Sequence, residues 1–134
     1  MKIIHVDGGA FVEPPSYKFH DAYFSVMESD NSKNGKLVHF EKNIGDVWSG
    51  VAEYYAIKWA VENVKERPLT ITSDCLVAFS WVKKGKKPTP KISLELPPLD
   101  LSEIKLVWQH NNLADIWNAE NHSPKYIPRE YLKN

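Results

Sequence analysis

The sequence has little of several features that mark particular classes of protein. It has one cysteine, Cys75, in 134 residues, so no disulfide can form within the chain. We therefore expect a reducing compartment and a cytoplasmic location. No apolar run is long enough to span a membrane, and the N-terminal stretch is charged too early for a signal peptide. The formal net charge of +0 lacks the basic excess that many nucleic-acid-binding proteins show.

What remains is the composition of an ordinary globular domain. The chain is 43% hydrophobic and 25% charged, and its length suits one hydrophobic core. No repeat or change of composition divides it. We therefore expect a single domain over residues 1–134, with its core over 2–121 and an irregular, proline-containing extension over 122–134.

Strand-like and helix-like hydrophobic patterns succeed each other along the chain. Consecutive apolar residues bounded by glycine or proline predict buried strands, and a helical period begins after Trp48, with Ser49 as its N-cap and Pro68 as its stop. Strands are predicted over 2–7, 20–29, 35–45, 69–74 and 104–109, helices over 49–64, 75–84 and 112–120, and loops over 10–19 and 85–98. This order predicts an α/β fold, a mixed five-stranded sheet with three antiparallel strands and then parallel strands, flanked by helices.

Four acidic residues stand where these elements meet one edge of the sheet. Asp7 and Asp74 close predicted strands, Glu53 lies near the start of the first helix, and Asp115 lies in the first turn of the last. The carboxyl ends of parallel strands lie at the same sheet edge, so we expect the four acids to converge. Such a cluster of like charge needs cations, and oxygen ligands suit Mg²⁺ or Mn²⁺.

The segments that carry these acids resemble ribonuclease H. "HVDGGA" is similar to the family's first strand, and "SGVAEYYAIKWAVE" resembles the segment that opens its first long helix. "ITSDCLVAF" is similar to the strand that ends in Ser-Asp, and "HNNLADIWNAE" resembles the final Asn-x-x-Ala-Asp motif, with Asn111 four residues before Asp115. The motifs occur in the family's order. They imply a ribonuclease H-like fold, of type 1, in the short form without a basic handle.

The resemblance implies a metal-dependent endonuclease that hydrolyses the RNA strand of an RNA/DNA hybrid and leaves 5′-phosphate and 3′-hydroxyl ends. Two Mg²⁺ or Mn²⁺ ions per site would clamp the attacking and leaving oxygens. Asp7 would bridge both ions, Asp115 would hold the ion that activates water, and Glu53 and Asp74 would hold the other. His110 would assist water activation or product release, unless it is an ordinary surface histidine.

Substrate contacts are predicted around the acids. Gly8 and Gly9 would let a phosphate approach the backbone, and Trp48 is the tryptophan we expect to touch substrate. Ser49 and Gly50 stand where the family has paired asparagines that read 2′-hydroxyls, so substrate choice is open. The basic stretch "KKGKKPTPK" over 83–91 is either a solvated loop or a loop that binds the phosphates of nucleic acid. The predicted substrate-binding residues are Gly8, Gly9, Trp48, Ser49, Gly50, Lys84, Lys86, Lys87 and Asn111.

Other conspicuous side chains are interpreted as structural. His5, His122, Trp59, Trp117 and Cys75 all fall in this group, Cys75 because no basic residue adjoins it in the sequence to activate a thiolate. Two other functions stay open. One is a non-catalytic nucleic-acid-binding or scaffolding module on the same fold, and the other is a related nuclease, integrase-like or exonuclease, with a different nucleic-acid substrate.

Overall fold

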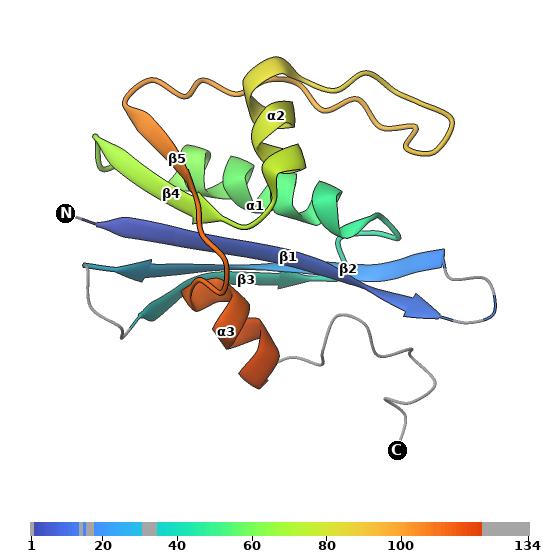
Figure 1. Ribbon diagram of the computed structural model, residues 1–134, viewed down its shortest axis with the longest axis horizontal. Coiled ribbons are helices and arrows are strands. Elements are labelled where there is room, and N and C mark those ends of the chain that lie inside the picture. Colours follow the sequence, from blue (N-terminus) through green and yellow to red (C-terminus); the bar gives the residue numbers. More distant parts are fainter. Residues whose placement is uncertain (1, 14, 16–17, 31–34, 122–134) are drawn as a thin grey trace.

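The structure, a computed structural model, describes residues 2–13, 15, 18–30 and 35–121. Its sheet has five strands in the order β3-β2-β1-β4-β5 (Figure 1). The strands are β1 (Ile3–Glu13), β2 (Lys18–Ser29), β3 (Lys36–Lys42), β4 (Leu69–Ser73) and β5 (Ile104–Trp108), and the helices are α1 (Ser49–Asn63), α2 (Leu76–Lys84) and α3 (Leu113–Asn121). Strands β1 to β3 pair antiparallel, and β4 and β5 run parallel to β1. The predicted fold class is confirmed.

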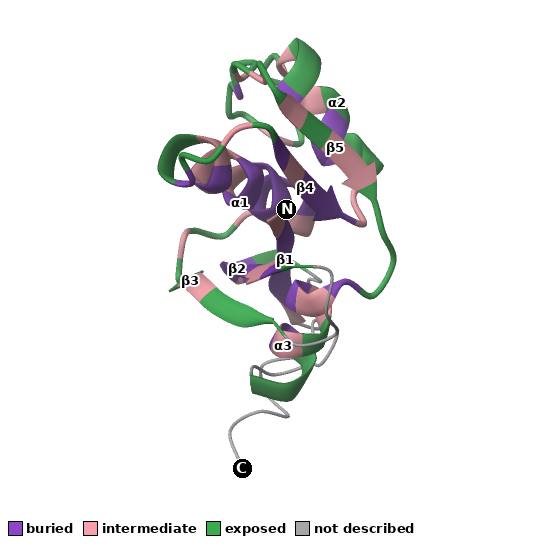
Figure 2. Ribbon diagram, turned by 90° about the vertical axis from the view of Figure 1, so that its left-hand side faces the viewer, coloured by how far each residue is buried: buried purple, intermediate pink, exposed green. Residues whose placement is uncertain are grey.

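Helices cover both faces of this sheet. Helices α1 and α2 lie on one side and α3 lies on the other (Figure 1). The main hydrophobic core is on the α1 side, where Ile4 and Val6 of β1 and Ile71 of β4 pack with Ile57 of α1 and Val82 of α2, all fully buried. Figure 2 shows the buried side of α1 against β1 and β4.

The pleat of β1 sends alternate side chains to these two faces. Ile4 and Val6 enter the core beneath α1, whereas His5 and Asp7 contact residues of α3. Polar side chains in this part of β1 therefore face α3. The position of an acid depends on the face of the sheet that it occupies as well as on the end of its strand.

Strand β1 does not end at Asp7. It pairs with β2 as far as Glu13, with a register shift between Gly9 and Phe11, so the predicted loop over 10–19 is wrong. The two glycines suggested a turn, but each lies opposite an aromatic residue of β2, Gly8 opposite Phe24 and Gly9 opposite Tyr23. Pairing with β2 extends the strand through a sequence that has little strand propensity of its own.

The start of α1 also differs from the prediction. The helix begins at Ser49, and Trp48 occupies the N-cap position without a side-chain cap hydrogen bond. Ser49 is therefore not the N-cap. The carbonyl of Trp48 accepts the first helical bonds, from the N–H groups of Val51 and Ala52. The other helices and strands lie close to their predicted bounds, while His122 and the predicted extension over 122–134 lie outside the described residues.

The segment over 85–98 has no regular helix, as predicted, but it is tied to itself by one bridge between Lys86 and Leu96. Leu96 is buried in the main core. None of the helices in the described residues is both long and apolar enough to cross a membrane.

Candidate active site

Three of the four predicted acids meet at the centre of the sheet. Carboxylate oxygens of Asp7, Asp74 and Asp115 all lie within 4.8 Å of one another, and we call these residues the acidic triad. Asp7 is fully buried, and Asp74 and Asp115 are partly buried. Oxygen donors gathered at this spacing fit Mg²⁺ or Mn²⁺, which prefer carboxylate and water ligands. The donor set therefore fits the cation that the sequence implies.

Strand register brings the first two members together. Strands β1 and β4 pair with His5 beside Thr72, so continuing the register by two residues brings Asp7 beside Asp74. Both side chains then point to the face that α3 covers, because alternate residues of neighbouring strands share a face. Asp115 reaches the same place from the first turn of α3.

Asn112 fixes the position of Asp115. Its side-chain oxygen accepts the N–H of Asp115 at 3.0 Å, which is an N-cap hydrogen bond to the third helical residue. Its amide nitrogen donates to the carbonyls of Val6 and Thr72, at 3.1 Å each, one from β1 and one from β4. The start of α3 is therefore attached to the two strands that supply the other acids. Asn112 was not predicted as a site residue, although the N-cap rule applied to 112–120 indicates it. The substrate contact predicted for the neighbouring Asn111 stays a prediction.

His5 belongs to the same buried network. Its Nδ1 lies 3.5 Å from the N–H of Leu113, and its Nε2 lies 2.9 Å from the hydroxyl of Ser29. Burial lowers the pKa of His5, which favours the neutral ring. A neutral ring that accepts at Nδ1 donates at Nε2, so both nitrogens serve structure, in agreement with the interpretation from sequence.

Glu53 is not part of the acidic triad. Its carboxylate, on the fifth residue of α1, accepts the main-chain N–H of Gly8 and the hydroxyl of Ser73, each at 2.9 Å. Gly8 follows Asp7 in the sequence and Ser73 precedes Asp74. Glu53 therefore binds the direct neighbours of two triad residues. It does so from the α1 layer, while the triad opens toward α3.

Gly8 also has a structural role that was not predicted from the sequence. A Cβ atom built on it would lie 2.6 Å from the main-chain carbon of Ala52 and from the nitrogen of Glu53. No real Cβ tolerates such a contact, so the glycine is what lets α1 approach β1. The close approach of this helix gives Gly8 a structural use, and the predicted substrate contact of Gly8 stays a prediction. Gly9, beside it, is buried opposite Tyr23.

Asn118 is a site residue that was not predicted from the sequence. It lies on α3, three residues after Asp115, and it is 2% exposed. Its amide nitrogen donates to Oδ2 of Asp7 at 2.7 Å. The signal was present in the sequence, because residues three apart share one face of a helix.

Comparisons with known proteins show the fold to which this site belongs. The PFV RNase H domain superposes with a TM-score of 0.55 at 13% identity, covering 88% of this chain and 87% of that one. The fold is that of ribonuclease H. The protease-reverse transcriptase of prototype foamy virus gives a TM-score of 0.56 at 15% identity, covering 92% of this chain and 21% of that longer chain.

The foamy viral protease-reverse transcriptase in complex with RNA/DNA hybrid gives a TM-score of 0.55 at 15% identity, covering 90% of this chain and 19% of that one. At these identities the likeness is one of fold. In sequence, the chain matches no family description and no curated protein.

On this ribonuclease H-like fold, Trp48 covers the start of α1. Its ring lies against Gly50, where a Cβ would be 2.7 Å from the indole, and it meets Trp81 of α2 edge to face at 5.8 Å. Trp48 also lines an open groove of about 970 Å³, together with Lys18 of β2 and Lys91 of the 85–98 segment. Ser49 is partly buried and Gly50 is buried. Of the basic stretch over 83–91, Lys91 is the residue that lines this groove with Trp48.

The predicted phosphate-binding lysines differ in their surroundings. The ammonium of Lys86 donates to the carbonyls of Lys87 and Ile92, at 2.9 and 3.1 Å, and lies 5.9 Å from the centre of the Trp81 ring. Lys87 is exposed and pairs with Glu95 at 3.3 Å. Lys84 is exposed in the last turn of α2. Lys84 and Lys87 therefore face solvent, whereas Lys86 helps to hold its own loop together.

At the rim of the triad, His110 stacks on Trp108, with ring centres 6.4 Å apart and planes inclined by 13°. Trp108 is 54% exposed, and its indole N–H donates to the carbonyl of Asp74 at 3.1 Å. This is an exposed aromatic surface attached to a triad residue. Asn111 is exposed in the same loop, with a left-handed φ of 53°. Neither His110 nor Asn111 belongs to the group of three carboxylates.

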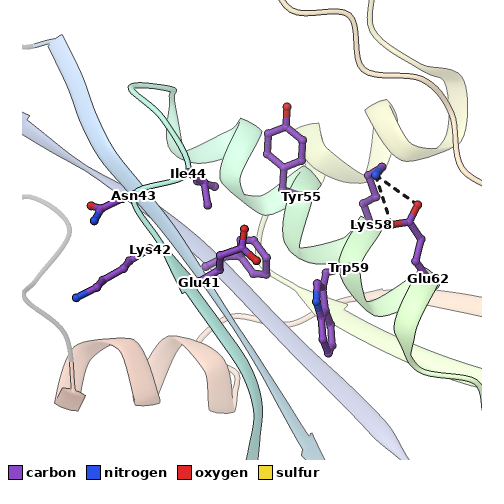
Figure 3. A pocket seen from close by; sticks show the side chains of 9 residues that line it. Glu41, Lys42, Asn43, Ile44, Tyr55, Lys58, Trp59 and Glu62 are labelled. Atoms are coloured by element: carbon purple, nitrogen blue, oxygen red, sulfur yellow. Dashed lines mark hydrogen bonds and ion pairs between the residues drawn. The ribbon is translucent and has the colours of Figure 1, made fainter.

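A separate pocket of about 350 Å³ lies between β3 and α1 (Figure 3). Its walls carry Glu41, Tyr55 and Trp59, and Lys58 pairs there with Glu62 at 3.3 Å. None of the residues predicted as functional lines it. Opposite charges in its wall already neutralise each other, so we place the candidate active site at the acidic triad.

The tryptophans interpreted as core residues lie at the margins of the core. Trp59 is partly buried and stacks on His39, with ring centres 4.3 Å apart. Trp117 is partly buried beside Phe40. Cys75 packs against the main core, which agrees with its structural interpretation.

Proposed function

We propose that this chain is a metal-dependent endonuclease that hydrolyses the RNA strand of RNA/DNA hybrids and leaves 5′-phosphate and 3′-hydroxyl ends. The observation that carries the proposal is the acidic triad, whose oxygens lie within 4.8 Å of one another. The ribonuclease H-like fold supports it. One of the solved structures with this fold is a reverse transcriptase in complex with RNA/DNA hybrid.

Each carboxylate has a role that follows from its position. With two Mg²⁺ or Mn²⁺ ions bound, the site would polarise the phosphate, generate the attacking hydroxide and stabilise the leaving oxygen. Asp7, central and buried, would hold both ions, while Asp74 and Asp115 would each hold one from the flanks. Glu53 would join Asp74, because a carboxylate oxygen that accepts one hydrogen bond keeps a further lone pair.

The surroundings of the triad suggest where nucleic acid binds. Trp108 presents an exposed indole whose orientation is fixed by its bond to the carbonyl of Asp74, and we propose that it stacks on the substrate beside the cleavage site. His110 would act at this rim on water or product. Trp48 would contact the phosphate backbone at the groove by the start of α1, and Lys84 and Lys87 would contact it from the end of α2 and the loop that follows.

A non-catalytic binding or scaffolding module is the second candidate. The observation that favours it is the engagement of Glu53, whose two hydrogen bonds give this acid a structural use. The acidic triad argues against a non-catalytic module, because three acids held together on one face of a sheet repel one another unless a cation is bound.

Purified protein incubated with labelled RNA/DNA hybrid, duplex RNA and duplex DNA, with Mg²⁺, Mn²⁺ or EDTA, tests the proposal. We expect cleavage of the RNA strand of the hybrid, dependent on the cation, and no cleavage by Asp115→Asn. Binding of hybrid without any cleavage would favour the non-catalytic module. Cleavage of duplex DNA or duplex RNA in preference to hybrid would favour a related nuclease with another substrate.

A further inference from the structure

Asn118 makes a contact that the proposed chemistry does not yet use. It is 2% exposed on the face of α3 that meets the sheet, and its amide nitrogen donates to Oδ2 of Asp7 at 2.7 Å. The same nitrogen lies 3.4 Å from the carbonyl of Asp7. A neutral donor thus fixes one oxygen of the acid that would be shared by both cations.

The second polar atom of this amide is unsatisfied. Oδ1 of Asn118 is buried and has no hydrogen-bond partner among the described residues. A buried carbonyl oxygen without a partner is destabilising, so native proteins rarely leave one without a use. Because Nδ2 of the same planar amide is bonded to Asp7, Oδ1 lies beside the acidic triad.

Anchoring of α3 does not account for Asn118. Asn112 already joins the start of the helix to β1 and β4. The hydroxyl of Ser25 adds a bond from β2 to the carbonyl of Ala114, at 3.4 Å. Ala114 itself is fully buried against the sheet. The helix therefore has its own attachments, and the amide of Asn118 can serve another purpose.

We propose that Asn118 is a positioning residue of the cation site, an inference that rests on the proposed function. Its N–H holds Asp7 by one oxygen, so that the carboxylate keeps its orientation against the repulsion of Asp74 and Asp115. Its Oδ1 accepts a hydrogen bond from a water ligand of the cation, since Mg²⁺ keeps several waters when it binds protein carboxylates. Outer groups of this kind orient the ligands and raise metal affinity.

The test is Mn²⁺ binding by the nucleic-acid-free chain, followed by calorimetry and by the electron paramagnetic resonance signal of free Mn²⁺. Asn118→Leu keeps the number and branching of the side-chain heavy atoms and removes both polar atoms. We expect its dissociation constant for Mn²⁺ to rise by about 10–100-fold, the usual effect of removing an outer partner. Asn121→Leu is the matched control, because it lies on the same helix and, among the described residues, its amide bonds only the carbonyl of Trp117. We expect the control to bind as the parent does.

Circular dichroism and thermal unfolding without metal show whether each variant is folded. A folded Asn118→Leu that binds Mn²⁺ as tightly as the parent would overturn the inference and leave the proposed function standing. A parent that binds no Mn²⁺ would overturn both. If Asn118→Leu does not fold, Asn118→Ser, whose shorter side chain does not reach Asp7, is measured in the same way, and an unchanged dissociation constant there would equally overturn the inference.

Discussion

The main-chain N–H of Gly8 donates to the carboxylate of Glu53 at 2.9 Å and so joins strand β1 to helix α1. The contact requires a bare backbone at position 8, since a Cβ there would lie 2.6 Å from two main-chain atoms of the helix. The glycine after the first acid and the acid of the helix thus hold each other in place. Through this bond, α1 is fixed beside the strand that carries Asp7.

We expect Gly8→Ala to destabilise the fold. The added methyl must push α1 away from β1, an overpacking strain of about 1–3 kcal/mol, and the bond to Glu53 weakens with it. Urea unfolding measures the change. Ser73→Ala removes the other donor to Glu53 without adding volume, and we expect it to cost less, about 1 kcal/mol. Equal stability of Gly8→Ala and the parent would mean that α1 is not held at this distance.

Asp7→Asn should abolish cleavage and leave the fold intact. The amide is nearly isosteric and its oxygen can still accept from Asn118, but the charge that would bridge two cations is absent. Removal of one of three neighbouring charges also relieves repulsion, so we expect metal-free thermal stability at least equal to the parent's. Cleavage rates in Mg²⁺ and melting in EDTA provide the measurements. A variant that cleaves at the parent rate would refute the two-metal assignment.

Glu53→Gln separates a catalytic from a structural role for this acid. Glutamine can still accept the N–H of Gly8 and can donate to the hydroxyl of Ser73, so both hydrogen bonds survive and stability should change little. The negative charge is removed, and we expect a fall in cleavage rate of at least about 100-fold if Glu53 holds a cation. A folded variant with the parent's rate in Mg²⁺ would restrict Glu53 to holding β1, β4 and α1 together.

Charge reversal at Lys84 and Lys87 should weaken binding equally across nucleic-acid sequences and flatten its dependence on salt. Lysines that bind phosphates add affinity without reading bases, and removing one such lysine lowers the salt slope by about 1. Lys86 is reversed separately, because its ammonium also holds the carbonyls of Lys87 and Ile92. The dissociation constant for hybrid is measured over a range of salt concentrations, and an unchanged slope for the double variant would identify a solvated loop.

Discrimination between hybrid and other duplexes should respond to position 76. Leu76 is 64% exposed after Asp74, and Leu76→Gln introduces a donor without disturbing the core. We expect the ratio of cleavage rates on hybrid and duplex RNA to rise by an amount that corresponds to about 1 kcal/mol.

The companion change, Gly50→Asn, must displace the ring of Trp48, which lies 2.7 Å from the position of the new Cβ. We expect it to help only if Trp48 moves, so the two substitutions are first measured singly and then together. If Leu76→Gln leaves the ratio unchanged, selectivity does not depend on a donor at that position.

The amino-acid sequence predicts the order of the elements and the fold class. It also predicts that Asp7, Asp74 and Asp115 lie together. Consecutive apolar residues, helical spacing after Trp48 and proline-rich breaks are local signals, and they placed nearly every helix and strand. The pairing of Asp7 with Asp74 followed from the parallel arrangement that this order dictates. The inferences about single elements succeeded because each depends on neighbours in the chain, and the pairing of the two acids needed only the order of those elements.

The side of the sheet that each acid occupies depends instead on contacts between distant parts of the chain. The length of β1 depends on pairing with β2, and no local signal carries that pairing through two glycines. Glu53 reaches the sheet from the α1 layer and is bound by Gly8 and Ser73, while Asp7 faces α3 and is bound by Asn118. A strand's pleat separates its successive residues onto opposite faces, so Asp7 meets α3 while Gly8, the next residue, meets Glu53 of α1.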